Sequence, residues 1–144
     1  MAKILSAVFT LLFLFGQPLG AQTAKTPRTE IKNWAAFEKL LHNSGMTLQW
    51  IGWEVRAPVE TKYKNGTLFL KSEQVAVDGI GKLSIDGYVV GIDKQNFVFR
   101  GIIRITDTPD AGRTCIKTGD SLFGITQNRK YWRLREFEWC DGLT

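Results

Sequence analysis

Three hydrophobic patterns follow one another along the chain, and the first is a continuous apolar stretch near its start. Residues 4–15 are apolar except for Ser6 and Thr10, Lys3 precedes them, and Leu19-Gly20-Ala21 follows. A basic tip, a short apolar stretch and a small residue at the cut are typical of a secretory signal peptide. The stretch is shorter than the about 20 apolar residues that span a bilayer, and a core helix would show a polar face. We therefore expect a signal peptide over residues 1–21 and a periplasmic or secreted mature protein without a transmembrane segment.

The second pattern is a short amphipathic segment. Residues 22–32 are polar and lack periodicity, so we expect a flexible lead-in there. After Asn33, a residue type that caps helices, Trp34, Phe37 and Leu40 recur at helical spacing. Asn43-Ser44-Gly45 is typical of a helix end. We expect one helix of about ten residues, which is too short to be stable alone and must pack on the rest of the fold.

The third pattern, apolar residues at strand period, covers the rest of the chain. Residues 47–55 predict a strand with a bulge beside Gly52, or a strand buried on both faces. Asn65-Gly66 predicts a type I′ hairpin turn, because both residue types accept positive φ angles. Further expected elements are a short strand over 75–77, a loop over 108–112, and a hairpin of 122–126 with 130–137 around Gln127-Asn128-Arg129.

Two segments with the same alternation, residues 83–89 and 97–103, repeat at an offset of 14. Only a turn at Lys94-Gln95-Asn96 separates them, so we expect a long antiparallel hairpin. Each segment has a glycine at its middle, Gly87 and Gly101. Such a glycine marks sharp bending or the close approach of another backbone, and long strands that bend at mid-length are what small barrels and half-barrels require.

Together these segments predict a mainly β fold: an antiparallel, barrel-like or strongly coiled sheet of about eight strands, with one short N-terminal helix packed on it. Residues 33–144 are expected to form a single β-rich domain, large enough to bury one core. The apolar content of 44% and charged content of 23% are ordinary for a globular protein. The net charge of +5 is modest; it favours acidic surfaces of the cell envelope, whereas export makes nucleic acid a poor partner.

The two cysteines, Cys115 and Cys140, are expected to form a structural disulfide, because an isolated pair in an oxidising compartment usually does. A zinc site would need further ligands, and a redox-active pair would normally have the C-x-x-C spacing. A hairpin turn centred between Gln127 and Asn128 would place the two cysteines opposite each other, at a Cα separation of roughly 4.5 Å that a disulfide tolerates.

The sequence offers no recognisable catalytic or metal-binding constellation. His42, the single histidine, follows the helix and is expected to lie at its end, and triad-type catalysis without a second histidine is improbable. Glu54 with Glu73 or Asp86 would be a carboxylate pair for glycoside cleavage, but solvated strand charges are the simpler interpretation. We therefore predict no catalytic residues, no metal site and no cofactor.

The candidate ligand-binding residues are aromatic and cationic. Tryptophans supply apolar walls in ligand sites, although a core built from large side chains explains them equally; the candidates are Trp50, Trp53, Trp132 and Trp139. A second group shares one face of the expected final strand and could grip carboxylates, phosphates or sulfates: Arg129, Tyr131, Arg133 and Arg135. A solvated outer face that blunts sheet pairing is the alternative for this group.

Gly52-Trp53 near the first expected strand resembles, in part, the Gly-x-Trp pattern of lipocalins. Glycine and tryptophan are adjacent here, so we assign no family and transfer no residues from that resemblance. The sequence predicts an exported, soluble, non-enzymatic binding protein for a small or anionic ligand or an envelope component. The alternative is a protein-interaction module, such as an inhibitor or accessory subunit of an envelope enzyme or complex, and an unrecognised carboxylate enzyme is a third possibility.

Overall fold

The computed structural model describes residues 27–136 and residue 140. The expected signal peptide over residues 1–21 lies outside the described residues. The elements are, in chain order, β1 (Glu30–Ile31), α1 (Trp34–Leu41), β2 (Glu60–Lys64), β3 (Thr67–Val75), β4 (Lys82–Ile92), β5 (Asn96–Thr106), β6 (Thr114–Gly124) and β7 (Arg133–Leu134). No helix in this part of the chain is long and apolar enough to cross a membrane.

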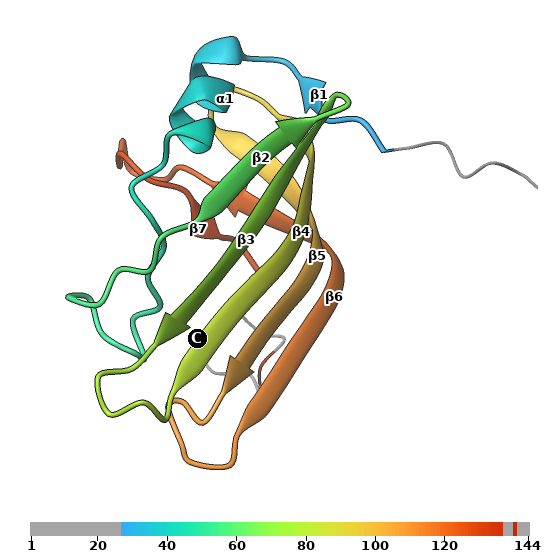
Figure 1. The fold of residues 1–144 in the computed structure, drawn as a ribbon. Coiled ribbons are helices and arrows are strands. Elements are labelled where there is room, and N and C mark those ends of the chain that lie inside the picture. Colours follow the sequence, from blue (N-terminus) through green and yellow to red (C-terminus); the bar gives the residue numbers. More distant parts are fainter. Residues whose placement is uncertain (1–26, 137–139, 141–144) are drawn as a thin grey trace, which may run out of the picture.

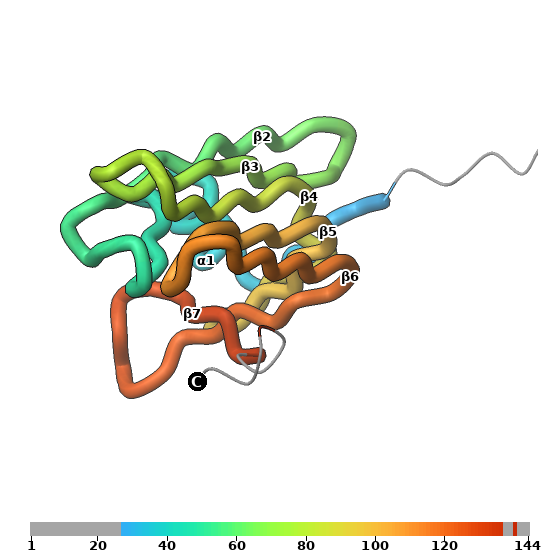
Figure 2. Tube along the Cα trace, turned by 90° about the horizontal axis from the view of Figure 1, so that it is seen from below, coloured from blue at the N-terminus to red at the C-terminus, as the bar shows by residue number. Residues whose placement is uncertain are grey.

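All the strands belong to one sheet, in which β2 to β7 follow one another in chain order and pair antiparallel. The sheet is open, with β2 and β7 at its ends (Figure 1). It curves from β2 round to β7, and α1 lies on the inner side of that curve (Figure 2). The predicted mainly β, antiparallel fold with one short helix is confirmed.

Helix α1 forms where the sequence predicts it. The side chain of Asn33 accepts a hydrogen bond from the backbone N–H of Ala36 at 2.9 Å, which satisfies one of the free donors of the first turn. Phe37 and Leu40 are buried against the inner face of the sheet. Trp34, by contrast, is 62% exposed. The helix therefore packs on the sheet through only three buried residues, Ala36, Phe37 and Leu40.

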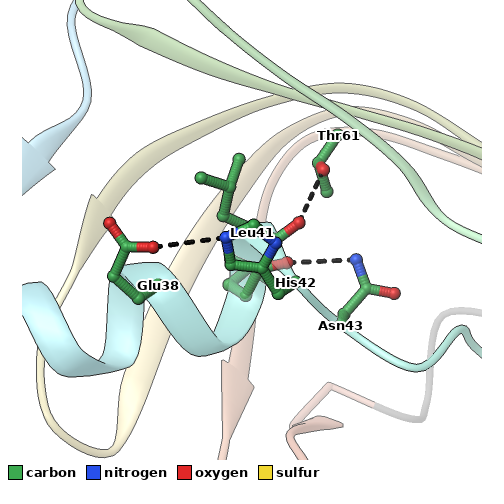
Figure 3. Close-up of polar contacts among 6 residues, drawn as sticks. Glu38, Leu41, His42, Asn43 and Thr61 are labelled. Carbon is green, nitrogen blue, oxygen red and sulfur yellow. Dashed lines mark hydrogen bonds and ion pairs between the residues drawn. The ribbon is translucent and has the colours of Figure 1, made fainter.

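The end of α1 is tied to the edge strand β2 (Figure 3). The hydroxyl of Thr61 donates to the carbonyl of Leu41 at 2.8 Å, and the amide of Asn43 donates to the carbonyl of Leu40 at 3.0 Å. His42 is the C-cap residue, and its Nε2 lies 3.4 Å from a carboxylate oxygen of Glu38. Its imidazole is 75% exposed, which places the single histidine at the helix end on the surface.

The β2–β3 hairpin turns at Asn65 and Gly66, whose φ angles are 54° and 82°. Positive φ at both positions defines the type I′ turn that the Asn-Gly pair predicts. The turn fixes the register of the two strands, so Tyr63 pairs with Leu68. Leu68 and Leu70 then point inward and are buried, while Phe69 lies on the outer face. The predicted short strand over residues 75–77 reduces to the last residue of β3, Val75.

The mid-strand glycines predicted to mark a close approach are register partners. Gly87 of β4 pairs with Gly101 of β5, which pairs with Gly119 of β6. A Cβ added at Gly101 would lie 2.3 Å from the carbonyl oxygen of Asp86 and 2.7 Å from the Cα of Gly87. The ring of Phe99 covers both glycines from the inner side. The missing side chains therefore let the two backbones and one large aromatic ring occupy the same region.

The prediction of a strand over residues 47–55 is wrong. The segment between α1 and β2 is a loop, and the isolated Met46–Ala57 bridge joins its two ends. Leu48, Trp50 and Ile51 still pack on the core. Gly52-Trp53, which resembles part of a lipocalin strand motif, lies in this loop, and Trp53 is 55% exposed.

Gln74 of β3 holds this loop in place. Its side chain is 1% exposed and points inward from the sheet. Its carbonyl accepts from the N–H of Leu48 at 2.6 Å, and its amide donates to the carbonyl of Val55 at 2.6 Å. Thr108 adds a bond from its hydroxyl to the carbonyl of Trp50 at 3.0 Å. Buried polar side chains of β3 and of the β5–β6 loop thus satisfy backbone groups that a strand would have satisfied by pairing.

The expected flexible lead-in over residues 22–32 also needs correction at its end. Glu30–Ile31 form β1, which pairs parallel with Gly91 and Ile92 of β4. The hydroxyl of Thr29 is buried, donating to the carbonyl of Val89 at 2.6 Å and accepting from the N–H of Leu68 at 2.8 Å. A strand of two residues leaves no periodicity in the sequence, so its pairing could not be predicted.

Candidate functional site

A disulfide links Cys115 on β6 to Cys140, as predicted, with the two Cα atoms 5.4 Å apart. Both cysteines are buried and belong to the core. β7 pairs with the last two residues of β6. The disulfide attaches Cys140 near the first residue of β6, at the other end of that strand.

The predicted register of the β6–β7 hairpin is wrong by two residues. The turn is centred as expected, because Gln127 and Asn128 have φ angles of 52° and 55°. A regular ladder from this turn would pair Phe123 with Trp132, but Phe123 pairs with Leu134. The extra residues on the second limb shorten β7 to Arg133–Leu134. They also release Trp132 from the ladder, and its ring meets Phe97 edge-on at 5.6 Å.

The candidate anion-binding group is only partly assembled on one surface. Tyr131 is 48% exposed, and the guanidinium carbon of Arg129 lies 5.9 Å from its ring centroid. Arg133 is half-buried, whereas Arg135 is exposed and its methylenes lie over Gly124. The predicted alternation holds for Trp132 and Leu134, which pack on the core. Among the described residues, none of the three arginines has a carboxylate within 4.0 Å.

The three candidate pocket tryptophans that the structure describes do not share a site. Trp50 packs on the core from the loop that Gln74 holds, while Trp53 lies exposed on the same loop. Trp139 lies outside the described residues. Trp132 lines a surface cavity. Of the carboxylates considered for glycoside cleavage, Glu54 lies in the loop, and Glu73 and Asp86 lie exposed on β3 and β4.

The cavity beside Trp132, which we call the Trp132 cleft, has a volume of about 250 Å³. Three segments far apart in the sequence form it: the start of α1, the β4–β5 turn and the β6–β7 hairpin. The backbone N–H of Ile125 donates to the carbonyl of Gln95 at 2.9 Å, which holds the last two together. The lining residues are Asn33, Ala35, Ala36, Lys39, Lys94, Ile125 and Trp132.

The cleft combines an apolar wall with two cations. Nζ of Lys39 lies 4.7 Å from the centroid of the Trp132 ring, a cation–π contact. Lys94 lines the cleft from the β4–β5 turn. Nε1 of Trp132 is buried and has no hydrogen-bond partner among the described residues. Because Nε1 is buried, the groups that the cleft offers to a ligand are the two ammonium groups, which favour a ligand that carries negative charge.

Asp93 organises the turn that presents Lys94. One oxygen of its carboxylate accepts from the N–H of Gln95 at 2.7 Å and from the N–H of Asn96 at 2.8 Å. These hydrogen bonds to the charged form, the Gln95 bond first, hold the pKa of Asp93 below its usual value.

We expect this turn to weaken at acid pH. Because the pKa of Asp93 is lower in the folded state, its stabilising contribution is complete above the unfolded pKa, near 3.8, and is lost as the pH falls through the folded value. Asp93→Asn keeps an acceptor oxygen but removes the charge. Urea denaturation at pH 7 should show a loss of less than about 1 kcal/mol in the free energy of unfolding, since the site is partly exposed. The difference from the parent should shrink below pH 4; a constant difference down to pH 2 would contradict this role.

The comparison with protein families gives one assignment. The model of the PM1083 family matches residues 28–144. The chain belongs to the PM1083 family. A relative in Pasteurella multocida (strain Pm70), described as uncharacterized protein PM1083, is 34% identical over 107 residues, which cover 73% of this chain and 69% of the relative. No solved structure matches the chain.

The PM1083 family match includes every residue that lines the Trp132 cleft and both cysteines. Of the lining residues, only Trp132 is a ligand-binding candidate from the sequence. Lys39 belongs to the polar side of the helix and Lys94 to a turn. No sequence motif marks either lysine as a ligand-binding residue. Their juxtaposition depends on long-range packing, which is why sequence patterns do not reveal the cleft.

Proposed function

We propose that this chain is an exported binding protein that holds a small anionic ligand with an apolar body in the Trp132 cleft. The observation that carries the proposal is the pair of lysines, Lys39 and Lys94, that lines the cleft beside the ring of Trp132. Export is supported by the signal-peptide pattern of residues 1–21 and by the Cys115–Cys140 bond, since structural disulfides persist in oxidising compartments.

The size of the cleft limits the ligand. Sites for drug-sized molecules have volumes of about 300–1,000 Å³, and this cleft, at about 250 Å³, lies just below that range. The methyl groups of Ala35 and Ala36 and the side chain of Ile125 contribute apolar surface. A short aliphatic or single-ring carboxylate therefore fits better than a nucleotide or an extended polymer.

The donors of the cleft favour one end of such a ligand. Lysine ammonium groups are mobile point charges and do not require the planar, bidentate geometry that arginine imposes. A carboxylate in the cleft can approach the ammonium group of Lys39 or Lys94, which neutralises its charge. Since hydrogen bonds to charged groups contribute about 1.5–3 kcal/mol, losing one lysine should weaken binding measurably.

Calorimetric titration with hexanoate, and with hexanamide as its neutral counterpart, tests the proposal. Hexanoate should bind the mature protein more tightly than hexanamide, and Lys94→Met should weaken hexanoate binding about tenfold or more. Lys82→Met is the matched control, because Lys82 is an exposed lysine at the other end of β4. Binding should also weaken as salt rises.

Two results would contradict the proposal. Equal affinity for hexanoate and hexanamide would show that the charge is not recognised. Equal losses in Lys94→Met and Lys82→Met would show that the net charge of the protein, and not the Trp132 cleft, attracts the anion.

A further inference from the structure

We propose that the outer face of the sheet carries a second binding site, for one pyranose unit of a neutral glycan. A hollow of about 380 Å³ opens on this face, opposite the core and independent of the Trp132 cleft. We call it the outer hollow; it is lined by Glu60, Thr61, Lys62, Phe69, Leu70, Lys71, Asp86 and Gly87. Leu70 is buried in the core, so it meets the hollow through its backbone.

Phe69 supplies the apolar surface of the outer hollow. Its side chain is 39% exposed although it lies at the middle of a paired strand. The C–H groups on one face of a pyranose carry partial positive charge, and the face of an aromatic ring carries the complementary negative charge. An exposed aromatic ring in a hollow of this size therefore suits one sugar ring.

A row of side chains across the sheet holds Phe69 in place. Phe69 is the register partner of Tyr88, and their rings meet edge-on at 6.4 Å. Tyr88 is in turn the partner of Arg100, and Arg100 is the partner of Asp120. The guanidinium donates to the carboxylate with an Nη2–Oδ2 distance of 2.7 Å. Since each member is fixed by the next, Phe69 keeps its position without a ligand.

The charges around the outer hollow balance. Glu60 and Asp86 oppose Lys62 and Lys71, so the site favours neither an anion nor a cation. Nζ of Lys71 lies 3.9 Å from Oδ2 of Asp86, which is too long for a hydrogen bond. Both groups therefore retain hydrogen-bonding capacity. A hydroxyl group donates and accepts at once, so adjacent sugar hydroxyls can satisfy an ammonium donor and a carboxylate acceptor side by side.

The probes for this site are two neutral oligosaccharides, maltotetraose and N-acetylated chitotetraose, titrated into the ¹⁵N-labelled mature protein. At least one should shift the backbone amide signals of Phe69, Lys71 and Asp86. Phe69→Ala should weaken the binding of that oligosaccharide about tenfold, which corresponds to the free energy of one aromatic contact. Phe69→Leu retains the apolar volume and should lose binding as well, which separates loss of the ring from loss of folding.

Ile116→Ala is the matched control, since Ile116 is 49% exposed on β6, away from the outer hollow. This variant should bind the oligosaccharide as tightly as the parent protein does. Absence of shifts with both oligosaccharides would overturn the proposal, and so would unchanged binding in a folded Phe69→Leu variant. Hexanoate should leave these amide signals unmoved, so failure at the outer hollow and failure at the Trp132 cleft are distinguishable.

Discussion

A Gly101→Ala variant is expected to lose more than about 3 kcal/mol of unfolding free energy, or to fail to fold. The added Cβ would lie 2.3 Å from the carbonyl oxygen of Asp86 and 2.7 Å from the Cα of Gly87. Both contacts are with backbone of the paired strand, so no side-chain rotation relieves them. The β4–β5 ladder would have to open at its centre, beneath the ring of Phe99.

Gly119→Ala separates this steric effect from the conformational freedom of glycine. Gly119 is in the same register row, with a φ of 93°, but nothing lies within 4 Å of its added Cβ. Its replacement should cost only about 1–2 kcal/mol, the penalty of a left-handed conformation for alanine. Urea denaturation measures both variants. Equal losses in the two would contradict the close-approach explanation.

Replacing both cysteines by alanine is expected to lower the free energy of unfolding by about 3 kcal/mol on the chain-entropy model. The link joins residues 25 apart in sequence, and its removal restores freedom to the unfolded chain. Because Cys115 and Cys140 are also buried in the core, the alanines add a small packing loss.

The parent protein under reducing conditions is the control for this variant. Its denaturation midpoint should fall to nearly that of Cys115→Ala with Cys140→Ala, while the variant should not respond to reductant. An unchanged midpoint in the double variant would contradict a stabilising role, and free thiols at both positions in non-reducing peptide mapping would contradict the bond itself.

Local signals in the sequence predict the elements that depend on a few neighbouring residues. Asn33 and the spacing of Phe37 and Leu40 predict α1, and Asn65-Gly66 predicts the β2–β3 turn. The mid-strand glycines predict the close approach in the β4–β5 hairpin, because only backbone geometry favours glycine there. In these cases the physical cause lies within one turn or one strand pair.

The wrong predictions have causes far away in the sequence. In residues 47–55 the apolar pattern indicates burial correctly for Leu48, Trp50 and Ile51, but not for Trp53. The loop that carries them is held by Gln74, which lies 26 residues from Leu48. The β6–β7 register fails for a similar reason: packing of Trp132 on Phe97 competes with regular strand pairing beyond the turn. The Trp132 cleft depends on the same packing, so its two lysines have no local signal.

The most direct test of the Trp132 cleft is the indole N–H signal of Trp132 in the ¹⁵N-labelled mature protein, assigned with Trp132→Phe. The Trp132 ring lines the cleft and contacts Lys39, so an anion bound in the cleft should change the surroundings of the ring and shift this signal. We predict that saturating hexanoate moves the Trp132 signal and leaves those of Trp34 and Trp53 in place, and that Lys94→Met raises the concentration required. A Trp132 indole signal that stays unmoved while hexanoate binds elsewhere would contradict the account.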